Sequence, residues 1–338
     1  MIFLYILFLL LGFVALIKGA DIFVDGAAGV AKNFKVPSVI IGLTIVAMGT
    51  SAPELAVSVS AALNGSNEIA VSNVIGSNIF NLLAVLGACA MISMVPVDKK
   101  IMKRDFPFSI LITIVLFAFT GIAAFSDGKI EAALKKLFAG KSTKTLMNEK
   151  VGDVSRVCGI VLLVLFVCYI AFLIREAKKN RLQDESEYAA IPMWKCTIFI
   201  LFGIALIVGG GEAVVISAKW IAKHFGMSET LIGLTIVALG TSLPELVTSV
   251  IASKKGENGL AVGNVVGSCI FNILLILGVS ATIHPMGVNL ASIFDLSILL
   301  IISIITYIFA TTKNGISFGE GIAMLLIYIA DVVFAAVR

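Results

Sequence analysis

The chain has 338 residues, of which 59% are hydrophobic and only 14% are charged. Soluble domains carry about 25% charged and about 45–50% apolar residues, so this composition excludes an ordinary soluble enzyme, a secreted disulfide scaffold and a disordered protein. The net charge of +4 is modest and indicates no nucleic-acid partner. A mean hydropathy of +1.08 predicts an all-α, multi-pass protein of the lipid bilayer, with room for roughly ten spans of about 20 residues.

Apolar runs predict ten transmembrane helices along the chain. In order, they cover residues 2–17, 36–63, 69–95, 106–125, 157–174, 193–216, 229–253, 260–283, 290–311 and 317–337. The first run has neither a basic leader nor a small-residue cleavage site, so we expect a retained span rather than a signal peptide. All five cysteines lie in or beside these runs without a CxxC pair, which indicates small buried apolar side chains rather than disulfides or metal ligands.

Two polar stretches interrupt the apolar runs. The insert 127–156 carries seven basic and four acidic residues, and its apolar residues around Leu134 and Phe138 suggest a short amphipathic surface helix. Residues 176–192 form a polar linker of mixed charge. Fourteen Lys and Arg residues lie on the side of the membrane that holds this linker, against three on the N-terminal side outside the insert. Because Lys and Arg collect in cytoplasmic loops, the linker is predicted to be cytoplasmic and both termini extracellular.

The chain contains an internal repeat. Residues 40–61 return as 231–252 with 16 of 22 positions identical, at an offset of 191. Residues 71–88 return as 262–279 at the same offset, with 11 of 18 identical. Five predicted spans separate the copies, and because five is odd the second copy crosses the bilayer in the opposite direction, as in the inverted-topology repeats of secondary transporters. The predicted domains are a first five-helix repeat in residues 1–175, the linker 176–192 and a second five-helix repeat in residues 193–338.

The motif GTSxPE lies at the middle of a predicted span in each copy, at residues 49–54 and 240–245. A proline within a helix removes one backbone N–H and frees a carbonyl. Irregular backbone at this depth is tolerated only where it lines a cavity inside the protein. Hydroxyl and carboxylate oxygens three or four residues apart can meet on one helix face, and each motif supplies such a set: Thr50, Ser51 and Glu54 in the first copy, and Thr241, Ser242 and Glu245 in the second.

The helix after each motif carries a polar stripe with a spacing of four: Asn73, Ser77 and Asn81, repeated as Asn264, Ser268 and Asn272. Carboxylate, hydroxyl, amide and backbone carbonyl oxygens without His or Cys favour a hard cation such as Ca²⁺ or Na⁺. A carboxylate at the bilayer centre costs about 2.5–3.5 kcal/mol on insertion scales, so bound cations or protons must compensate Glu54 and Glu245. For the first Asn of each stripe, hydrogen bonding between helices is the alternative interpretation.

Asp21 and Glu212 are related by the same offset. Asp21 has Lys18 and Asp25 as close neighbours in the sequence. This arrangement favours a local ion pair over a role in transport.

With these motifs the chain resembles the sodium/calcium exchanger family of the cation/calcium antiporter superfamily, and its prokaryotic members in particular, over nearly its whole length. The second family motif, GNxxGSNxxN, stands here at residues 72–81 and 263–272. Ser72 replaces its first Gly and Cys269 replaces an Asn, and we expect neither to be a ligand. The resemblance implies ion ligands from Thr50, Ser51, Glu54, Ser77, Asn81, Thr241, Ser242, Glu245, Ser268 and Asn272, with the carbonyls of Ala47 and Ala238.

The resemblance implies a secondary antiporter that exchanges Na⁺ for Ca²⁺ by alternating access, with electrogenic Ca²⁺ extrusion across the cell membrane. Asn272 stands where some members carry Asp, which argues against potassium cotransport. The expected partners are Na⁺, Ca²⁺ and the lipid bilayer, with no cofactor and no obligate protein partner. A Ca²⁺/H⁺ exchanger that uses the same two carboxylates is the alternative.

Two further classes are weaker: a cation channel, and an intramembrane enzyme with Ser51 or Ser242 as nucleophile. Neither serine has a His or Lys nearby in the sequence, and duplication of a whole catalytic site has no rationale. We therefore expect a protein that is not an enzyme.

Overall fold

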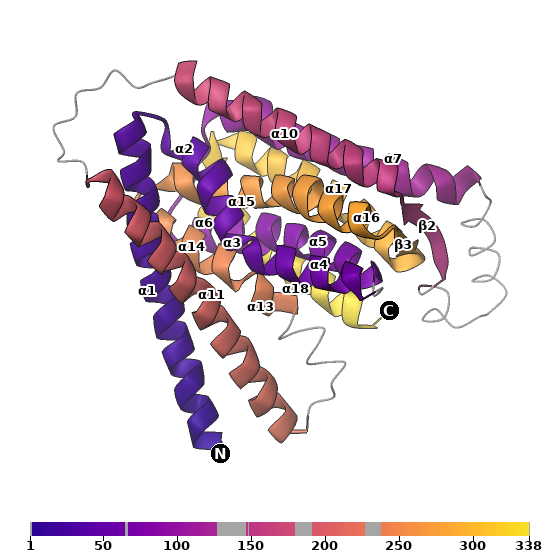
Figure 1. The fold of residues 1–338 in the computed structure, drawn as a ribbon, viewed down its shortest axis with the longest axis horizontal. Coiled ribbons are helices and arrows are strands. Elements are labelled where there is room, and N and C mark those ends of the chain that lie inside the picture. Colours follow the sequence, from indigo (N-terminus) through magenta and orange to yellow (C-terminus); the bar gives the residue numbers. More distant parts are fainter. Residues whose placement is uncertain are drawn as a thin grey trace.

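The computed structural model describes residues 2–64, 67–126, 147, 149–179, 191–226 and 238–337, and most of these residues are helical (Figure 1). In the first half the helices are α1 (Ile2–Phe34), α2 (Ser38–Ile41), α3 (Ala47–Thr50), α4 (Ala52–Leu63), α5 (Asn67–Phe80), α6 (Leu86–Ile92), α7 (Phe106–Ser126) and α10 (Arg156–Lys179), with π-helical turns η1 (Gly42–Val46), η2 (Asn81–Val85) and η3 (Ile101–Asp105). The second half has α11 (Met193–His224), α13 (Ala238–Thr241), α14 (Leu243–Lys254), α15 (Asn258–Phe271), η5 (Asn272–Leu277), α16 (Gly278–Ile283), α17 (Leu290–Thr312) and α18 (Phe318–Val337).

Seven helices of the described chain are long and apolar enough to cross a membrane, or eight if the bent pair α2–α4 counts as one span. The expected span 106–125 coincides with α7. Residues 229–237 of the expected span 229–253 lie outside the described ranges. The surface helix expected around Leu134 and Phe138 also lies outside them.

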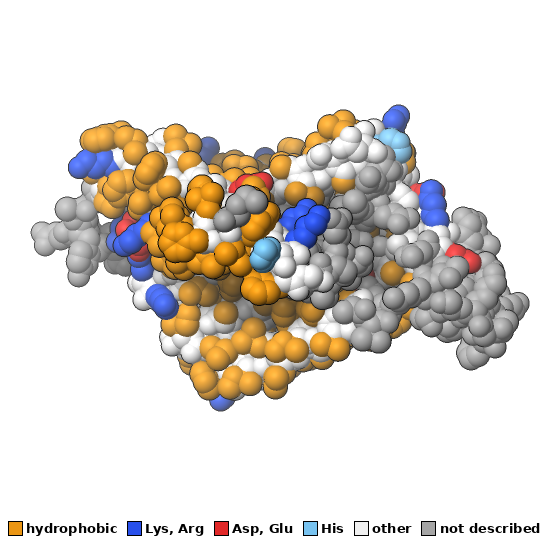
Figure 2. Space-filling model, turned by 90° about the horizontal axis from the view of Figure 1, so that it is seen from below, with side chains coloured by type: hydrophobic (Ala, Val, Ile, Leu, Met, Phe, Trp, Pro, Cys, Tyr) orange, Lys and Arg blue, Asp and Glu red, His pale blue; other side chains and the backbone are white. Residues whose placement is uncertain are grey.

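Hydrophobic side chains cover the outside of these helices. Phe3 on α1 is 77% exposed, and Val167 on α10 and Leu201 on α11 are each 64% exposed. Figure 2 shows one face on which hydrophobic side chains form broad areas, with charged side chains in small groups between them. Extended apolar surface of this kind indicates contact with lipid. Four of the five cysteines are buried as expected, whereas Cys168 on α10 is exposed, so that expectation was wrong for Cys168.

The helices α1 and α11 pack along each other as an antiparallel pair and extend beyond the rest of the helices (Figure 1). Glycines let the two backbones approach closely. A Cβ atom on Gly19 would lie 2.7 Å from the Cβ of Leu206, and one on Gly203 would lie 2.7 Å from that of Phe23. The close contact of small residues replaces the hydrophobic effect, which is absent between helices in lipid.

Two short antiparallel ribbons join the halves. Strand β1 (Val95–Pro96) pairs with β4 (Gly315–Ile316), and β2 (Lys150–Val154) pairs with β3 (Met286–Asn289). Strand β1 follows η2 and α6 in the first half, and it pairs with β4, which precedes the last helix of the second half, α18. Strand β3 follows η5 and α16 in the second half, and it pairs with β2, which precedes the last helix of the first half, α10. The sequence analysis did not predict these strands, because two to five residues are too few to show an alternating pattern.

Candidate cation-binding site

The two GTSxPE motifs interrupt their helices as predicted. The helices on either side of Ser51 meet at an angle of 49°. In the second copy α13 ends at Thr241 and α14 begins at Leu243. A proline lies in the first turn of each following helix. Each interruption places a glutamate in the first turn of a helix, where the unpaired backbone N–H groups favour negative charge.

The two interruptions meet, and each half holds the carboxylate of the other. Ser51 Oγ donates a hydrogen bond to Glu245 Oε1 at 2.9 Å, and Ser242 Oγ donates to Glu54 Oε1 at 2.9 Å. All four side chains are at most 3% exposed. Both contacts repeat at the offset of 191, so the structure brings the two predicted motifs together in one centre.

The polar stripes supply the next hydroxyls of this centre. Ser268 Oγ lies 3.0 Å from Ser51 Oγ, and Ser77 Oγ lies 3.1 Å from Ser242 Oγ. Because each inner serine gives its proton to a carboxylate, its partner serine donates to it. The stripe serines thus complete a short chain of hydroxyls on both sides of the centre.

Several buried atoms of the centre have no hydrogen-bond partner among the residues that the structure describes. They are one carboxylate oxygen each of Glu54 and Glu245, both amide atoms of Asn81, and the amide oxygen of Asn272. A buried polar atom without a partner is costly, and a buried carboxylate more so. Oxygen atoms that converge in a protein interior are the ligands that Na⁺ and Ca²⁺ require.

Thr248 is a buried hydroxyl that the sequence analysis missed. It lies one turn beyond Glu245 on α14, is 0% exposed and has no partner within the described part of the chain. Its repeat counterpart is Val57, so a comparison of the two copies hides it. A search for polar residues one turn after each glutamate could have found it.

Three further predicted ligands, Thr50, Thr241 and the carbonyl of Ala47, have protein partners. Thr50 Oγ1 lies 3.0 Å from Asn264 Oδ1 and 3.4 Å from the carbonyl of Ala47, which also accepts the N–H of Ser51. Thr241 ends α13, which begins at Ala238.

The first asparagine of each stripe connects neighbouring helices. Asn73 donates to Ser58 Oγ at 3.1 Å, and Asn264 donates to Ser249 Oγ at 2.9 Å. These contacts join α5 to α4 and α15 to α14, as the alternative interpretation of these two residues proposed.

Glycines bring α15 against α2 and α3 and so place the two motifs. A Cβ atom on Gly263 would lie 2.7 Å from the carbonyl oxygen of Val39, and one on Gly267 would lie 2.8 Å from the Cβ of Ala47. No larger side chain fits at these two positions without a shift of backbone.

An ion cluster ties the end of α14 to α1. Lys255 Nζ lies 2.8 Å from Asp21 Oδ1 and 2.6 Å from Asp25 Oδ1. The expected local ion pair of Asp21 with Lys18 is therefore wrong, because the cation comes from a residue far along the chain.

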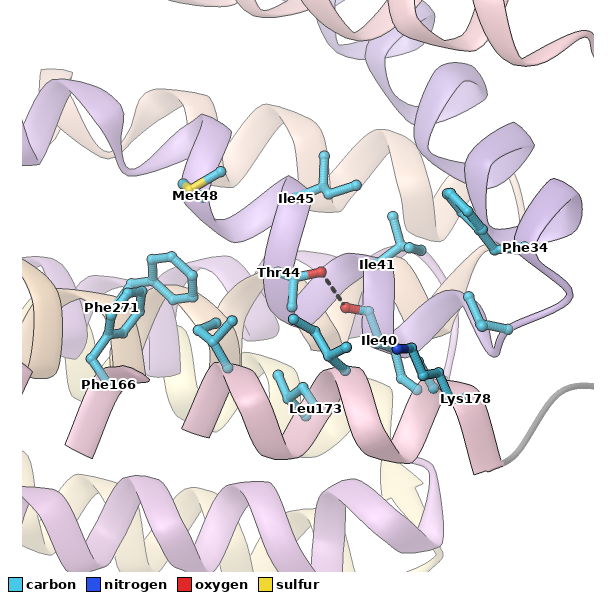
Figure 3. Close-up of a pocket in the computed structure, with 14 residues that line it drawn as sticks. Phe34, Ile40, Ile41, Thr44, Ile45, Met48, Phe166, Leu173, Lys178 and Phe271 are labelled. Carbon is cyan, nitrogen blue, oxygen red and sulfur yellow. Dashed lines mark hydrogen bonds between the residues drawn. The ribbon is translucent and has the colours of Figure 1, made fainter. Parts of the chain in front are cut away.

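A large cavity elsewhere in the structure is apolar. It measures about 500 Å³ and lies between η1 and α10, with Phe166 and Phe271 at one end and Phe34 and Lys178 at the other (Figure 3). The hydroxyl of Thr44 in its lining already donates to the carbonyl of Ile40 at 2.7 Å. Its lining offers no converging oxygens, so this cavity is a poorer candidate for a cation site than the packed centre around the two glutamates.

The chain matches the family model described as sodium/calcium exchanger protein over residues 4–175 and 195–337. It belongs to the sodium/calcium exchanger family. This member is 41% identical to CaxA of Alkalimonas amylolytica over 294 residues, which cover 85% of this chain and 83% of CaxA. It is 32% identical to the sodium/calcium exchanger MaX1 of Methanosarcina acetivorans, with 97% of each chain covered. A structure of the sodium-calcium exchanger NCX_Mj superposes over 100% of both chains with a TM-score of 0.78 and 30% identity.

Proposed function

We propose that this exchanger-family protein is a secondary antiporter that carries Na⁺ and Ca²⁺ in opposite directions by alternating access. The observation that supports this most strongly is the pair of buried carboxylates, each held by a serine of the other half and each left with one oxygen without a partner. Two carboxylates neutralise one Ca²⁺ or two Na⁺. Because both ions need the same oxygens, they exclude each other, and this exclusion couples their movements.

The proposed ion ligands are the two glutamates, the hydroxyls beside them, the two stripe asparagines and two backbone carbonyls: Thr50, Ser51, Glu54, Ser77, Asn81, Thr241, Ser242, Glu245, Ser268 and Asn272, with the carbonyls of Ala47 and Ala238. Thr248 is a further candidate, since its buried hydroxyl faces no partner in the described part of the chain.

We infer an architecture of ten transmembrane helices in two inverted repeats, residues 1–175 and 193–338, joined by a cytoplasmic linker at 176–192. The duplicated contacts at one offset support this symmetry. The distribution of Lys and Arg supports extracellular termini in the cell membrane.

Sodium is the proposed coupling ion. The names of MaX1 and NCX_Mj describe both as sodium/calcium exchangers, and both align with nearly all of this chain. If more Na⁺ charge enters than Ca²⁺ charge leaves, each net elementary charge gains about 2.3 kcal/mol per 100 mV of membrane potential. Ca²⁺ extrusion would then be electrogenic.

Uptake of radioactive Ca²⁺ into proteoliposomes tests this function. We expect rapid uptake with an outward Na⁺ gradient and none without a gradient. Uptake driven by an outward proton gradient in the absence of Na⁺ would instead support the Ca²⁺/H⁺ exchanger. Uptake without any counter-ion, at rates far above transporter turnover, would support a channel.

A further inference from the structure

A buried amide next to the cation centre, that of Asn78 on α5, connects the two halves. Asn78 is 1% exposed. Its Nδ2 donates to the backbone carbonyl of Cys269 at 3.3 Å, and its Oδ1 accepts a hydrogen bond from Asn272 Nδ2 at 2.9 Å.

The carbonyl of Cys269 determines the direction of this chain of hydrogen bonds. A backbone carbonyl only accepts, so Asn78 must turn its NH₂ group toward it. The oxygen of Asn78 then faces Asn272, which must present its own NH₂ group in return. The amide oxygen of Asn272 is left over, and it is the atom without a partner among the described residues. A backbone carbonyl outside the proposed ligand set thus fixes which atom of Asn272 is available to a cation.

The second half has no amide at the position that corresponds to Asn78. The repeat counterpart of Asn78 is Cys269, whose Sγ lies 4.0 Å from the carbonyl of Asn78. A thiol is a weak donor and a weak acceptor, so it orients a neighbouring amide poorly. The counterpart of Asn272 is Asn81, and both of its amide atoms are without a partner in the described structure. Among the described residues, Asn81 therefore has no hydrogen bond that selects its amide oxygen over its nitrogen.

We propose that Asn78 is a positioning residue that presents the oxygen of Asn272 to the cation before binding, whereas Asn81 takes its orientation only when the cation arrives. The inference rests on the proposed cation-binding function. It makes the two halves of the site unequal: one amide ligand is preorganised, and the other must be ordered at a cost to binding.

A double-mutant cycle in purified full-length protein tests this role, with Ca²⁺ affinity measured by calorimetry. We expect Asn78→Cys to weaken Ca²⁺ binding about 5-fold, since the lost hydrogen bond contributes about 1 kcal/mol to the orientation of Asn272. In an Asn272→Asp background the same change should not weaken binding, because a carboxylate has two oxygens and no NH₂ group to turn away. Equal weakening in both backgrounds would show that Asn78 only supports packing and would overturn the inference.

The converse substitution, Cys269→Asn, tests in the second half whether a neighbouring amide orients an asparagine ligand. It still tests the inference if the Asn78→Cys variant does not fold. The introduced amide can donate to the carbonyl of Asn78 and accept from Asn81, so we expect Ca²⁺ affinity to rise several-fold, about 3- to 10-fold. Unchanged or weaker affinity in the folded variant would contradict the inference. Failure of the wild-type protein to bind Ca²⁺ at all would instead refute the proposed function itself.

Discussion

The two halves of the chain form the same contacts around the cation centre but differ in the residues that surround it. In both halves a serine at the helix interruption donates to the opposite glutamate at 2.9 Å: Ser51 to Glu245, and Ser242 to Glu54. A site built twice in this way gives both halves an equal share of its negative charge. The centre therefore depends on neither half alone.

The surroundings are unequal. Asn78 in the first half corresponds to Cys269 in the second, and Lys255 in the second corresponds to Asn64 in the first. Lys255 forms ion pairs with two carboxylates of α1, whereas the uncharged Asn64 cannot form an ion pair. The ten side chains proposed as ligands are thus duplicated without exception, whereas the further candidate Thr248 and the side chains that orient ligands or join helices are not.

Removal of either carboxylate should have the largest effect. We expect Glu54→Gln and Glu245→Gln each to abolish Na⁺-driven Ca²⁺ uptake while the protein still folds, because a neutral amide cannot neutralise the cation and lowers the cost of insertion. Glu212→Gln on the exposed side of α11 is the matched control and should transport normally. Near-normal uptake by one of the two site variants would show that the halves do not share the charge equally.

The crossed serines should contribute less, and equally. Ser51→Ala and Ser242→Ala each remove a hydrogen bond to a carboxylate, which contributes about 1.5–3 kcal/mol, so Ca²⁺ affinity should fall about 10-fold or more in both. Ser303→Ala is the control, since its buried hydroxyl donates to the carbonyl of Leu299 on the same helix, away from the two glutamates. Isothermal titration of Ca²⁺ measures all three, and a clear difference between the first two would break the proposed symmetry.

The close approach of α15 to the first motif should determine stability. In Gly267→Ala the new Cβ would meet Ala47 Cβ at 2.8 Å, so we expect a loss of about 1–3 kcal/mol and a lower thermal midpoint in detergent. Gly209→Ala on α11 is the control, because apart from its two neighbours and the backbone of its own helix no atom of the described chain lies within 4 Å of the added Cβ. An unchanged midpoint in Gly267→Ala would mean that α15 and α3 are less tightly packed than the 2.8 Å approach implies.

The ion cluster at Lys255 should have the smallest effect. Its side chain and both carboxylates are partly exposed, and ion pairs in such positions contribute up to about 1 kcal/mol. We expect Lys255→Gln to lower the thermal midpoint slightly, with a smaller difference from wild type at high salt. Its exposed neighbour gives the control, Lys254→Gln, which should leave the midpoint unchanged. Equal midpoints for the two variants would show that the cluster does not tie α14 to α1.

The sequence predicted the parts of the site that depend on local chemistry. A proline in the middle of an apolar span removes a backbone hydrogen bond and bends or breaks the helix, so the breaks at Ser51 and Ser242 could be predicted. The repeat at one offset indicated that the two breaks belong to one centre, and the crossed hydrogen bonds confirm that they meet.

The features that were not predicted depend on contacts between distant segments. The partner of Asp21 is Lys255, more than 200 residues away, and nothing in either local sequence points to the other. The four strands are too short for a recognisable pattern. Thr248 and Asn78 escaped because a comparison of the two copies draws attention to residues that are the same in both, and these two are not.

Shared ligands are the central claim, and competition between the two ions tests it most directly. The Ca²⁺ dissociation constant of purified wild-type protein should be measured at increasing Na⁺ concentrations, with choline replacing Na⁺ to hold the ionic strength constant. Since both ions need the free oxygens of Glu54 and Glu245, we predict that the apparent constant rises steadily with Na⁺ and that saturating Na⁺ displaces bound Ca²⁺. A dissociation constant that does not change with Na⁺ would contradict the account.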